Sequence, residues 1–241
     1  MTSREQADLL QLERQVEKEI TQKLRANPTA VFAARLAAVA QQKIDLVHDA
    51  AAKKGVRFAC AKGCSYCCQL KVDAYPQETF RIARGLRERT DQAGLVEALA
   101  AHANRNKDVT DKRSREPCPF LVDHACSIYD LRPAMCRKTV SLDVERCKAF
   151  AETVPSDPEM FYKSNAIING AAKAYARAKL AFAPHELVSS VLLALSDPGA
   201  EARWWNGEDV FGTKSASRAQ TADAPFSGSA LPDRKIPPDP A

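Results

Sequence analysis

The sequence predicts a mainly α-helical fold: a single domain with one short β-hairpin and irregular cysteine-rich loops. Three observations predict it. Apolar residues recur at helical spacing along most of the 241 residues, and only one pair of short segments has the composition of paired strands. All eight cysteines fall between Cys60 and Cys147, and residues 148–241 contain none. With 45% hydrophobic content, a chain of this length can bury a core without cross-links.

An N-terminal helical region is predicted over residues 1–55. Residues 4–24 suggest a shorter polar helix that can fray. The stretch from Asn27 to Gly55 is typical of one long helix, with Asn27 as its cap, a proline in its first turn and Gly55 at its end. Six of its apolar residues share one face: Phe32, Leu36, Ala40, Ile44, Val47 and Ala51.

The central region, residues 56–150, contains all the cysteines together with two helices. We predict these helices within residues 75–89 and 91–106, the second capped by Asp91, although Gly85 weakens the prediction of the first. Residues 107–119 are charged and contain prolines, which predicts a loop. The segments FLV and CSIY, separated by residues 123–125, then predict the hairpin.

Two further helices are predicted over residues 151–205, packed on the same core. The first starts with Ser156 as its cap and ends near residue 182; its predicted apolar face holds Phe161, Ile168, Ala172, Tyr175 and Phe182. On the opposite, solvated face we expect Lys163, Lys173 and Arg177. The last helix runs from about residue 184 to 195, and the RWW stretch at 203–205 is expected to pack back on the core. Residues 206–241 are rich in Pro, Gly, Ser and Ala, which predicts a disordered tail.

The charge and hydropathy patterns exclude several classes of protein. The net charge of +5 is spread along the chain without an aromatic-interleaved basic patch, so we do not expect nucleic-acid binding. No apolar stretch approaches the ~20 residues of a membrane span, and the charged N-terminus lacks the apolar run of a signal peptide. We therefore expect a cytoplasmic protein without a membrane anchor. The sequence indicates no particular protein partner.

The stretch CAKGCSYCC, residues 60–68, places four thiols in nine positions. A disulfide framework is typical of small secreted domains, and the CSYC stretch lacks the β-α-β context of a thiol–disulfide enzyme. Ligands of a metal ion or cluster are the remaining explanation. Cys64 and Cys67 form a C-x2-C unit that can aim two sulfurs at one ion, and Gly63 supports the necessary turn. Because adjacent side chains tend to diverge, a mononuclear site would use either Cys67 or Cys68 and leave the other to a second metal or a cluster.

The second cysteine group lies within PCPFLVDHACSIYDLRPAMCRK and at Cys147. Cys136 follows a proline near an expected helix N-terminus, where the helix dipole favours a thiolate. Arg132, Arg137 and Lys138 are close enough in sequence to lower thiol pKa values further. His124 is better explained as a turn residue than as a ligand. The candidate metal ligands are Cys60, Cys64, Cys67, Cys68, Cys118, Cys126, Cys136 and Cys147. They could form two four-thiolate zinc sites, or one iron–sulfur cluster with four thiols to spare.

CAKGCSYCC followed by CPFL and CSIYDLRPAMCR resembles the YkgJ-type cysteine-cluster family, also described as the CxxCxxCC or zinc- or iron-chelating domain. This chain has three residues between its first two cysteines where the family's short name shows two. The resemblance implies a metal-binding domain over residues 56–150 that chelates zinc or iron, or an iron–sulfur cluster, through all eight cysteines. It implies no reaction.

No catalytic residue is predicted. Neither motif carries an Asp or Glu at a spacing that suggests a general base, and four thiolates would quench the Lewis acidity of a zinc ion. We therefore expect a structural or electron-carrying centre rather than a hydrolytic one. The alternative is an iron–sulfur redox protein or enzyme whose cluster transfers electrons or binds substrate.

Overall fold

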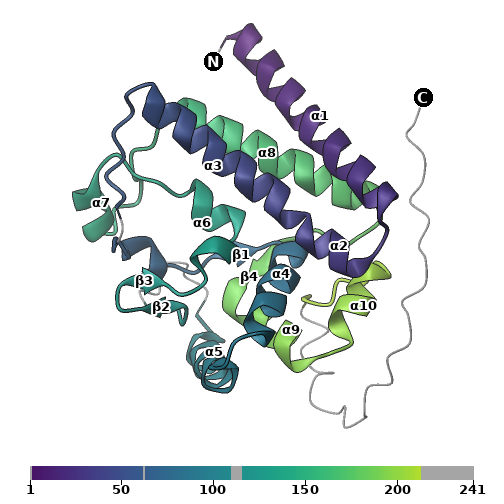
Figure 1. Ribbon diagram of the computed structural model, residues 1–241. Helices are drawn as coiled ribbons and strands as arrows, with labels where there is room; N and C mark the ends of the chain where they lie inside the picture. The colour runs from purple at the N-terminus through teal and green to yellow at the C-terminus, as the bar shows by residue number, and fades with distance from the viewer. Residues whose placement is uncertain (1, 62, 110–115, 213–241) are drawn as a thin grey trace.

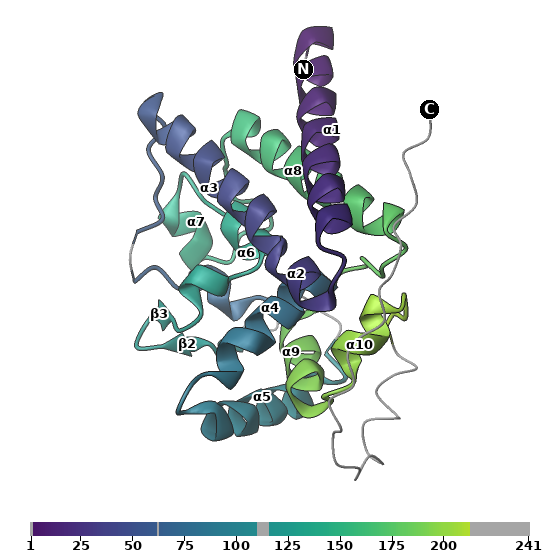
Figure 2. The ribbon, with the colours of Figure 1, turned by 45° about the vertical axis from the view of Figure 1, so that its right-hand side comes forward.

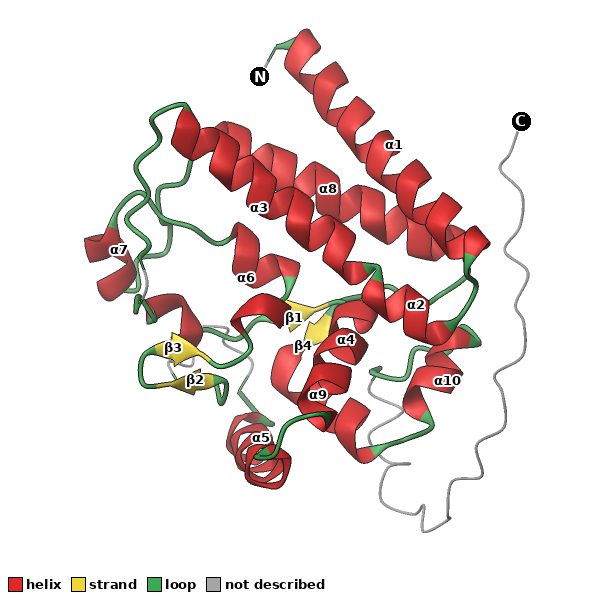
Figure 3. Ribbon diagram, in the orientation of Figure 1, coloured by secondary structure: helices red, strands yellow, loops and turns green. Residues whose placement is uncertain are grey.

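The computed structural model describes residues 2–61, 63–109 and 116–212, which form a mainly α-helical fold with two small antiparallel strand pairs (Figures 1 and 3). The predicted fold class is confirmed. The α-helices are α1 Ser3–Ala26, α2 Ala30–Arg35, α3 Ala37–Lys53, α4 Pro76–Arg87, α5 Gln92–Asn106, α6 Ala134–Lys138, α7 Val144–Lys148, α8 Pro158–Arg177, α9 Leu187–Ser196 and α10 Ala200–Trp205. Two 3-10 turns are η1 Tyr66–Gln69 and η2 Tyr129–Leu131, and the strands are β1 Asp73–Ala74, β2 Leu121–Val122, β3 Ala125–Cys126 and β4 His185–Glu186.

The long helices α1, α3 and α8 lie together on one side of the molecule, above α4, α5, α9 and α10 (Figures 1 and 2). The loops that carry the cysteines lie at the edge of this arrangement with α6, α7 and the β2–β3 hairpin, away from α10. The helices therefore form a frame, and the cysteine loops are attached to one end of it.

The N-terminal helix α1 is longer and better fixed than the predicted frayed helix. The Thr2 side chain accepts the N–H of Glu5 at 3.2 Å, and the Glu5 carboxylate accepts the N–H of Thr2 at 2.6 Å. This capping box satisfies backbone groups that the first turn leaves unpaired. Val16, Ile20 and Leu24 are fully buried where α1 packs against α8.

The basic residues of α8 lie at this same helix–helix contact. Lys173 forms an ion pair with Glu13 of α1, and Arg177 with Glu17. Lys173 is exposed, as predicted for a solvated face, and Arg177 is half-buried, but both are also ion-paired to α1, which the sequence did not indicate. The helices approach closely at Gly170, where an added Cβ would lie 2.4 Å from the carbonyl oxygen of Glu13.

The helix predicted from Asn27 to Gly55 is two helices, α2 and α3, separated at Leu36. Thr29, rather than Asn27, caps α2, because its side chain accepts the N–H of Phe32 at 3.3 Å. Gly55 has a φ of 94°, a conformation that suits glycine after a helix end. The predicted apolar stripe is confirmed, since its members are buried or half-buried.

The predicted face of α8 is only partly correct. Tyr175 is fully buried, but Phe161 and Phe182 are each 41% exposed, and Phe182 lies beyond the end of the helix. The cap is Asp157 rather than Ser156, with the Asp157 carboxylate accepting the N–H of the third helical residue at 2.8 Å.

A second core lies among α4, α5, α9 and the hairpin. Its buried members are Ala74, Ile82, Leu86, Leu99, Phe120, Ile128, Leu187, Val188 and Val191. Cys118 and Cys126 pack against this core. The hairpin turn holds Asp123 at φ 48° and His124 at φ 60°, as a two-residue turn of the primed types requires. The strand pair β1–β4 was not predicted, because its two-residue strands lie far apart in the chain.

The C-terminal part of the described chain packs on the first core. Trp204 and Trp205 of α10 are buried, which confirms that the RWW stretch packs back. Val210 is also fully buried, and the Phe211 ring lies 5.2 Å from that of Phe80. The prediction of a tail beginning at residue 206 is therefore wrong for residues 206–212, and residues 213–241 lie outside the described residues.

In the parts of the chain that the structure describes, no helix combines the length and the apolar character that a membrane crossing needs.

Candidate metal centre

Backbone hydrogen bonds hold the two cysteine motifs side by side. The N–H of Cys118 donates to the carbonyl of Cys68 at 2.7 Å. The N–H of Ala59, just before the first motif, donates to the carbonyl of Ser141 at 2.8 Å. The segments from residues 59 to 68 and 118 to 141 are thus joined at both ends, although about fifty residues separate them.

The first motif forms a tight turn followed by η1. Gly63 has a φ of 89°, which confirms the predicted turn, and the N–H of Cys68 donates to the carbonyl of Ser65 at 3.0 Å. The neighbouring thiol of Cys68 and then the desolvation of the sulfur raise the pKa of Cys67 far above its usual value, although the residue as a whole is exposed.

Backbone N–H groups already point at several sulfurs. The Cys60 sulfur accepts the N–H of Ser141 at 3.3 Å, and the backbone N–H groups of Phe120 and Ile128 lower the pKa of Cys118 and Cys126, respectively, against the larger effect of burial. A donor aimed at a sulfur favours the thiolate, which is the form that binds metal. These loops therefore have the local chemistry of thiolate ligands.

Cys136 is the third residue of α6, near a helix start as predicted. The expected low pKa is nevertheless wrong for the protein without metal. Burial raises the pKa of Cys136 well above its usual range, and the thiols of Cys67, Cys118 and Cys126 raise it further. Thiols of both motifs therefore influence the protonation of Cys136.

Arg132 is the cation that lies beside the thiols. Its guanidinium stacks 4.0 Å from the centre of the Tyr129 ring. Burial raises the pKa of Cys126, while the hydrogen bond from Ile128 and then the charge of Arg132 lower it. This agrees with the predicted role of Arg132 in supporting anionic sulfurs.

Arg137 and Lys138 have other partners. Arg137 is buried, donates to the Asp130 carbonyl at 2.7 Å and forms an ion pair with Asp45 of α3. Lys138 donates to the Asn165 side chain of α8 at 2.8 Å. Both side chains tie the second motif to the helical frame. The charge of Arg137 also lowers the pKa of Cys126, in agreement with its predicted role beside the sulfurs.

Cys67 connects two sets of thiols. Burial raises the pKa of Cys60, and the nearby thiols of Cys64, Cys67 and Cys147 raise it further. On the other side, burial raises the pKa of Cys118 to about 11, with contributions from Cys126 and Cys67. Thiols of the two motifs thus influence one another, and the backbone bond between Cys68 and Cys118 joins the motifs directly.

Cysteine thiols are suitable ligands for zinc or iron, but their sulfur atoms are not arranged around a common metal position. All eight cysteines are free thiols; Cys60 and Cys67 are exposed and the other six are half-buried. Among the described residues, no group of three or more His, Cys, Asp or Glu side chains has the arrangement that an ion needs. Binding therefore requires the sulfurs to rotate toward one another. His124 is an exposed residue of the hairpin turn, which agrees with its interpretation as a turn residue.

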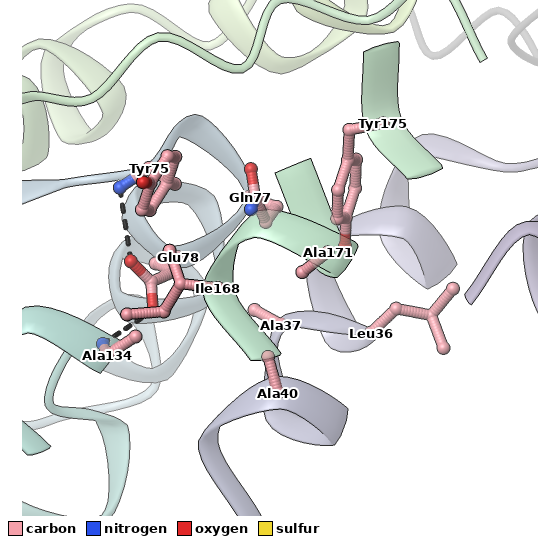
Figure 4. A pocket seen from close by; sticks show the side chains of 10 residues that line it. All are labelled: Leu36, Ala37, Ala40, Tyr75, Gln77, Glu78, Ala134, Ile168, Ala171 and Tyr175. Carbon is pink, nitrogen blue, oxygen red and sulfur yellow. Dashed lines mark hydrogen bonds between the residues drawn. The ribbon is translucent and has the colours of Figure 1, made fainter. Parts of the chain in front are cut away.

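Sequence reasoning missed Glu78, a buried carboxylate between α4 and the start of α6 (Figure 4). Its signal in the sequence is its place as the third residue of a helix that begins with Pro76, where a Glu completes a capping box.

Comparison with known proteins agrees with the arrangement of the thiols. Residues 59–157 match the family model CxxCxxCC, described as "Putative zinc- or iron-chelating domain". No curated protein and no solved structure matches the chain. The matched range holds all eight cysteines, whereas α1, α2, α3 and α8 lie outside it. Over residues 59–157 the chain is therefore similar to the CxxCxxCC family.

Proposed function

We propose that this domain binds zinc or iron through thiolates of both cysteine motifs acting together. The observation that carries the proposal is the pair of backbone links between Cys68 and Cys118 and between Ala59 and Ser141, which bring free thiols from distant segments into one region. Neither motif alone has the spacing of a self-sufficient zinc finger. The backbone N–H of Ser141, which donates to the sulfur of Cys60, supports the same proposal.

Within the centre, Cys67 is the thiol that both sets share. Cys60, Cys64 and Cys147 form one set with it. The other set comprises Cys68, Cys118, Cys126 and Cys136. This division suits two metal ions held close together, or one cluster with additional thiols around it.

The bound metal would act as a structural or electron-carrying centre. A hydrolytic zinc site usually has histidine or carboxylate ligands, an open position for water and a nearby base. Here the donors are thiols, which fill a zinc shell and stabilise a fold by about 10 kcal/mol or more per structural site. Such thiols need a reducing environment, so we propose that the protein acts in the cytoplasm.

Metal analysis of anaerobically purified protein tests the proposal. Cys64→Ser and Cys136→Ser, one from each motif, should each lower the bound metal. His124→Asn is a matched control in the same loops, because Asn tolerates the positive φ at that position. Visible absorption distinguishes an iron–sulfur cluster from zinc, which is colourless. Full metal retention in both cysteine variants would refute the shared centre.

A further inference from the structure

One buried carboxylate connects the start of α6 with the helical frame (Figure 4). Glu78 is only 3% exposed. Its Oε1 accepts the N–H of Ala134 at 2.7 Å and the side-chain N–H of Gln41 at 3.0 Å. Its Oε2 accepts the N–H of Tyr75 at 3.1 Å. The carboxylate therefore has three donors from three different segments of the chain.

The bond to Ala134 fixes the first turn of α6. Ala134 is the first residue of this helix, and its N–H has no acceptor within the helix. A carboxylate is the strongest acceptor available for such a group, because its charge also suits the helix N-terminus. Cys136 follows two residues later. Its position relative to the frame therefore depends on how firmly Ala134 is held.

The surroundings of Glu78 do not offer space for a substrate. The cavity beside it has a volume of about 10 Å³ and is lined mostly by apolar side chains, among them Leu36, Ile168 and Tyr175. This volume holds no more than one water molecule. A carboxylate that is buried, bonded through both oxygens and next to so small a cavity acts on its bonded partners and not on a ligand.

We propose that Glu78 is a positioning residue of the metal centre, which fixes Cys136 by holding the first turn of α6 against α3 and α4. The metal part of this inference rests on the proposed function, because it takes Cys136 as a ligand. Gln41 belongs to α3, before the matched family range, so the centre depends on a helix outside its own domain. Outer groups that orient ligands in this way commonly change metal affinity by about 10- to 100-fold when they are altered.

Two substitutions of Glu78 distinguish the effect of side-chain length from the effect of charge. Glu78→Asp keeps the charge but withdraws the carboxylate by one methylene, so it no longer reaches Ala134. Glu78→Gln loses the charge but keeps an oxygen that can accept from both Ala134 and Gln41. Tyr175→Phe is the matched control, because Tyr175 lines the same cavity and donates a buried hydrogen bond to the Ala33 carbonyl at 2.7 Å, with no link to α6.

The first measurement is alkylation of individual thiols in the metal-stripped full-length protein, followed by peptide mass spectrometry, with Cys147 as the internal reference. We expect Glu78→Asp to label Cys136 about 10-fold faster than the wild type, while Glu78→Gln and Tyr175→Phe stay within about 3-fold. The second measurement is metal loss to a chelator, which should be faster by a similar factor in Glu78→Asp alone.

Equal labelling of Cys136 in the wild type and Glu78→Asp would overturn the proposal, as would a parallel rise at Cys136 and Cys147, which indicates general loosening. Faster labelling in Glu78→Gln than in Glu78→Asp would also overturn it, because charge and not reach would then matter. A wild-type protein that binds no metal would refute the proposed function, whereas the labelling experiment would still decide the role of Glu78.

Discussion

Replacement of Gly170 by alanine tests the contact between α1 and α8. At this position a Cβ would lie 2.4 Å from the Glu13 carbonyl oxygen and 3.0 Å from the Cβ of Val16. The first neighbour is backbone, so it cannot move aside as the end of a flexible side chain could. The two helices must separate, or the α1 backbone must shift, to admit one methyl group.

The expected effect is the balance of two terms. Alanine favours a helix over glycine by about 1 kcal/mol. Overpacking a buried contact typically costs about 1–3 kcal/mol, and a clash with backbone falls at or beyond the upper end. We therefore expect Gly170→Ala to lower the free energy of unfolding by about 1–3 kcal/mol. In a domain of this size that corresponds to a fall in Tm of about 2–4 °C per kcal/mol.

Thermal and denaturant unfolding at constant metal content measure this change. Gly94→Ala is the matched control, because Gly94 lies in helix α5 with no atom within 4 Å of its added Cβ. This control should be unchanged or stabilised by up to about 1 kcal/mol. If Gly170→Ala were as stable as Gly94→Ala, the close approach of α1 and α8 would be incorrect.

Two further predictions concern the C-terminal segment and pH. A chain ending at residue 206 should lose about 2–4 kcal/mol of stability relative to one ending at residue 212, because it lacks buried Val210 and the packed ring of Phe211; equal melting temperatures would show that these side chains do not contribute. Metal uptake by the stripped protein should release protons, and the metal affinity should increase as the pH rises from about 6 to about 8. The reason is that burial raises the pKa of Cys118 to about 11, so its thiol must lose a proton to bind the metal. Calorimetry in two buffers of different ionisation enthalpy measures the proton release, and an affinity that does not change with pH would contradict the thiolate assignment.

Local signals in the sequence were sufficient for much of the fold. The hairpin was predicted from two short apolar segments separated by residues 123–125; the structure includes Ala125 in the second strand and leaves Asp123 and His124, both at positive φ, as the turn. The helix ends near Gly55 and Pro158 followed from residues with strong positional preferences. In each case the determining interactions lie within a few residues of one another, so they can be read without knowledge of the tertiary structure.

The predictions that failed depend on contacts between distant segments. The pairing of β1 with β4 joins Asp73 to Glu186, and two-residue strands leave no periodicity in the sequence. Likewise, the exposed position of Phe161 and the ion pair between Lys173 and Glu13 depend on where α1 packs on α8. Hydrophobicity alone placed the phenylalanine inside, and it could not reveal the partner of the exposed lysine.

In the candidate site, too, local sequence signals were sufficient for some features, whereas others depend on contacts between distant segments. Clustered cysteines identified the metal-binding region, because thiols in this number and spacing are uncommon for any other purpose in a chain of this length. The sequence could not reveal which thiols lie near one another, nor that Cys67 adjoins both sets. It also gave no indication that Arg137 pairs with Asp45 rather than with a sulfur.

The glycine in α4 connects the frame with the site. Gly85 weakened the helix prediction, yet the helix continues through it, and an added Cβ would lie 2.6 Å from Cδ1 of Leu131. The missing side chain makes room for η2, the turn between Cys126 and Cys136. The same helix α4 thus receives the second motif at Gly85 and holds the start of α6 through Glu78. Because the helices bury apolar cores of their own, we expect the binding energy of a metal to act mainly on the loops, whose ends this frame already fixes.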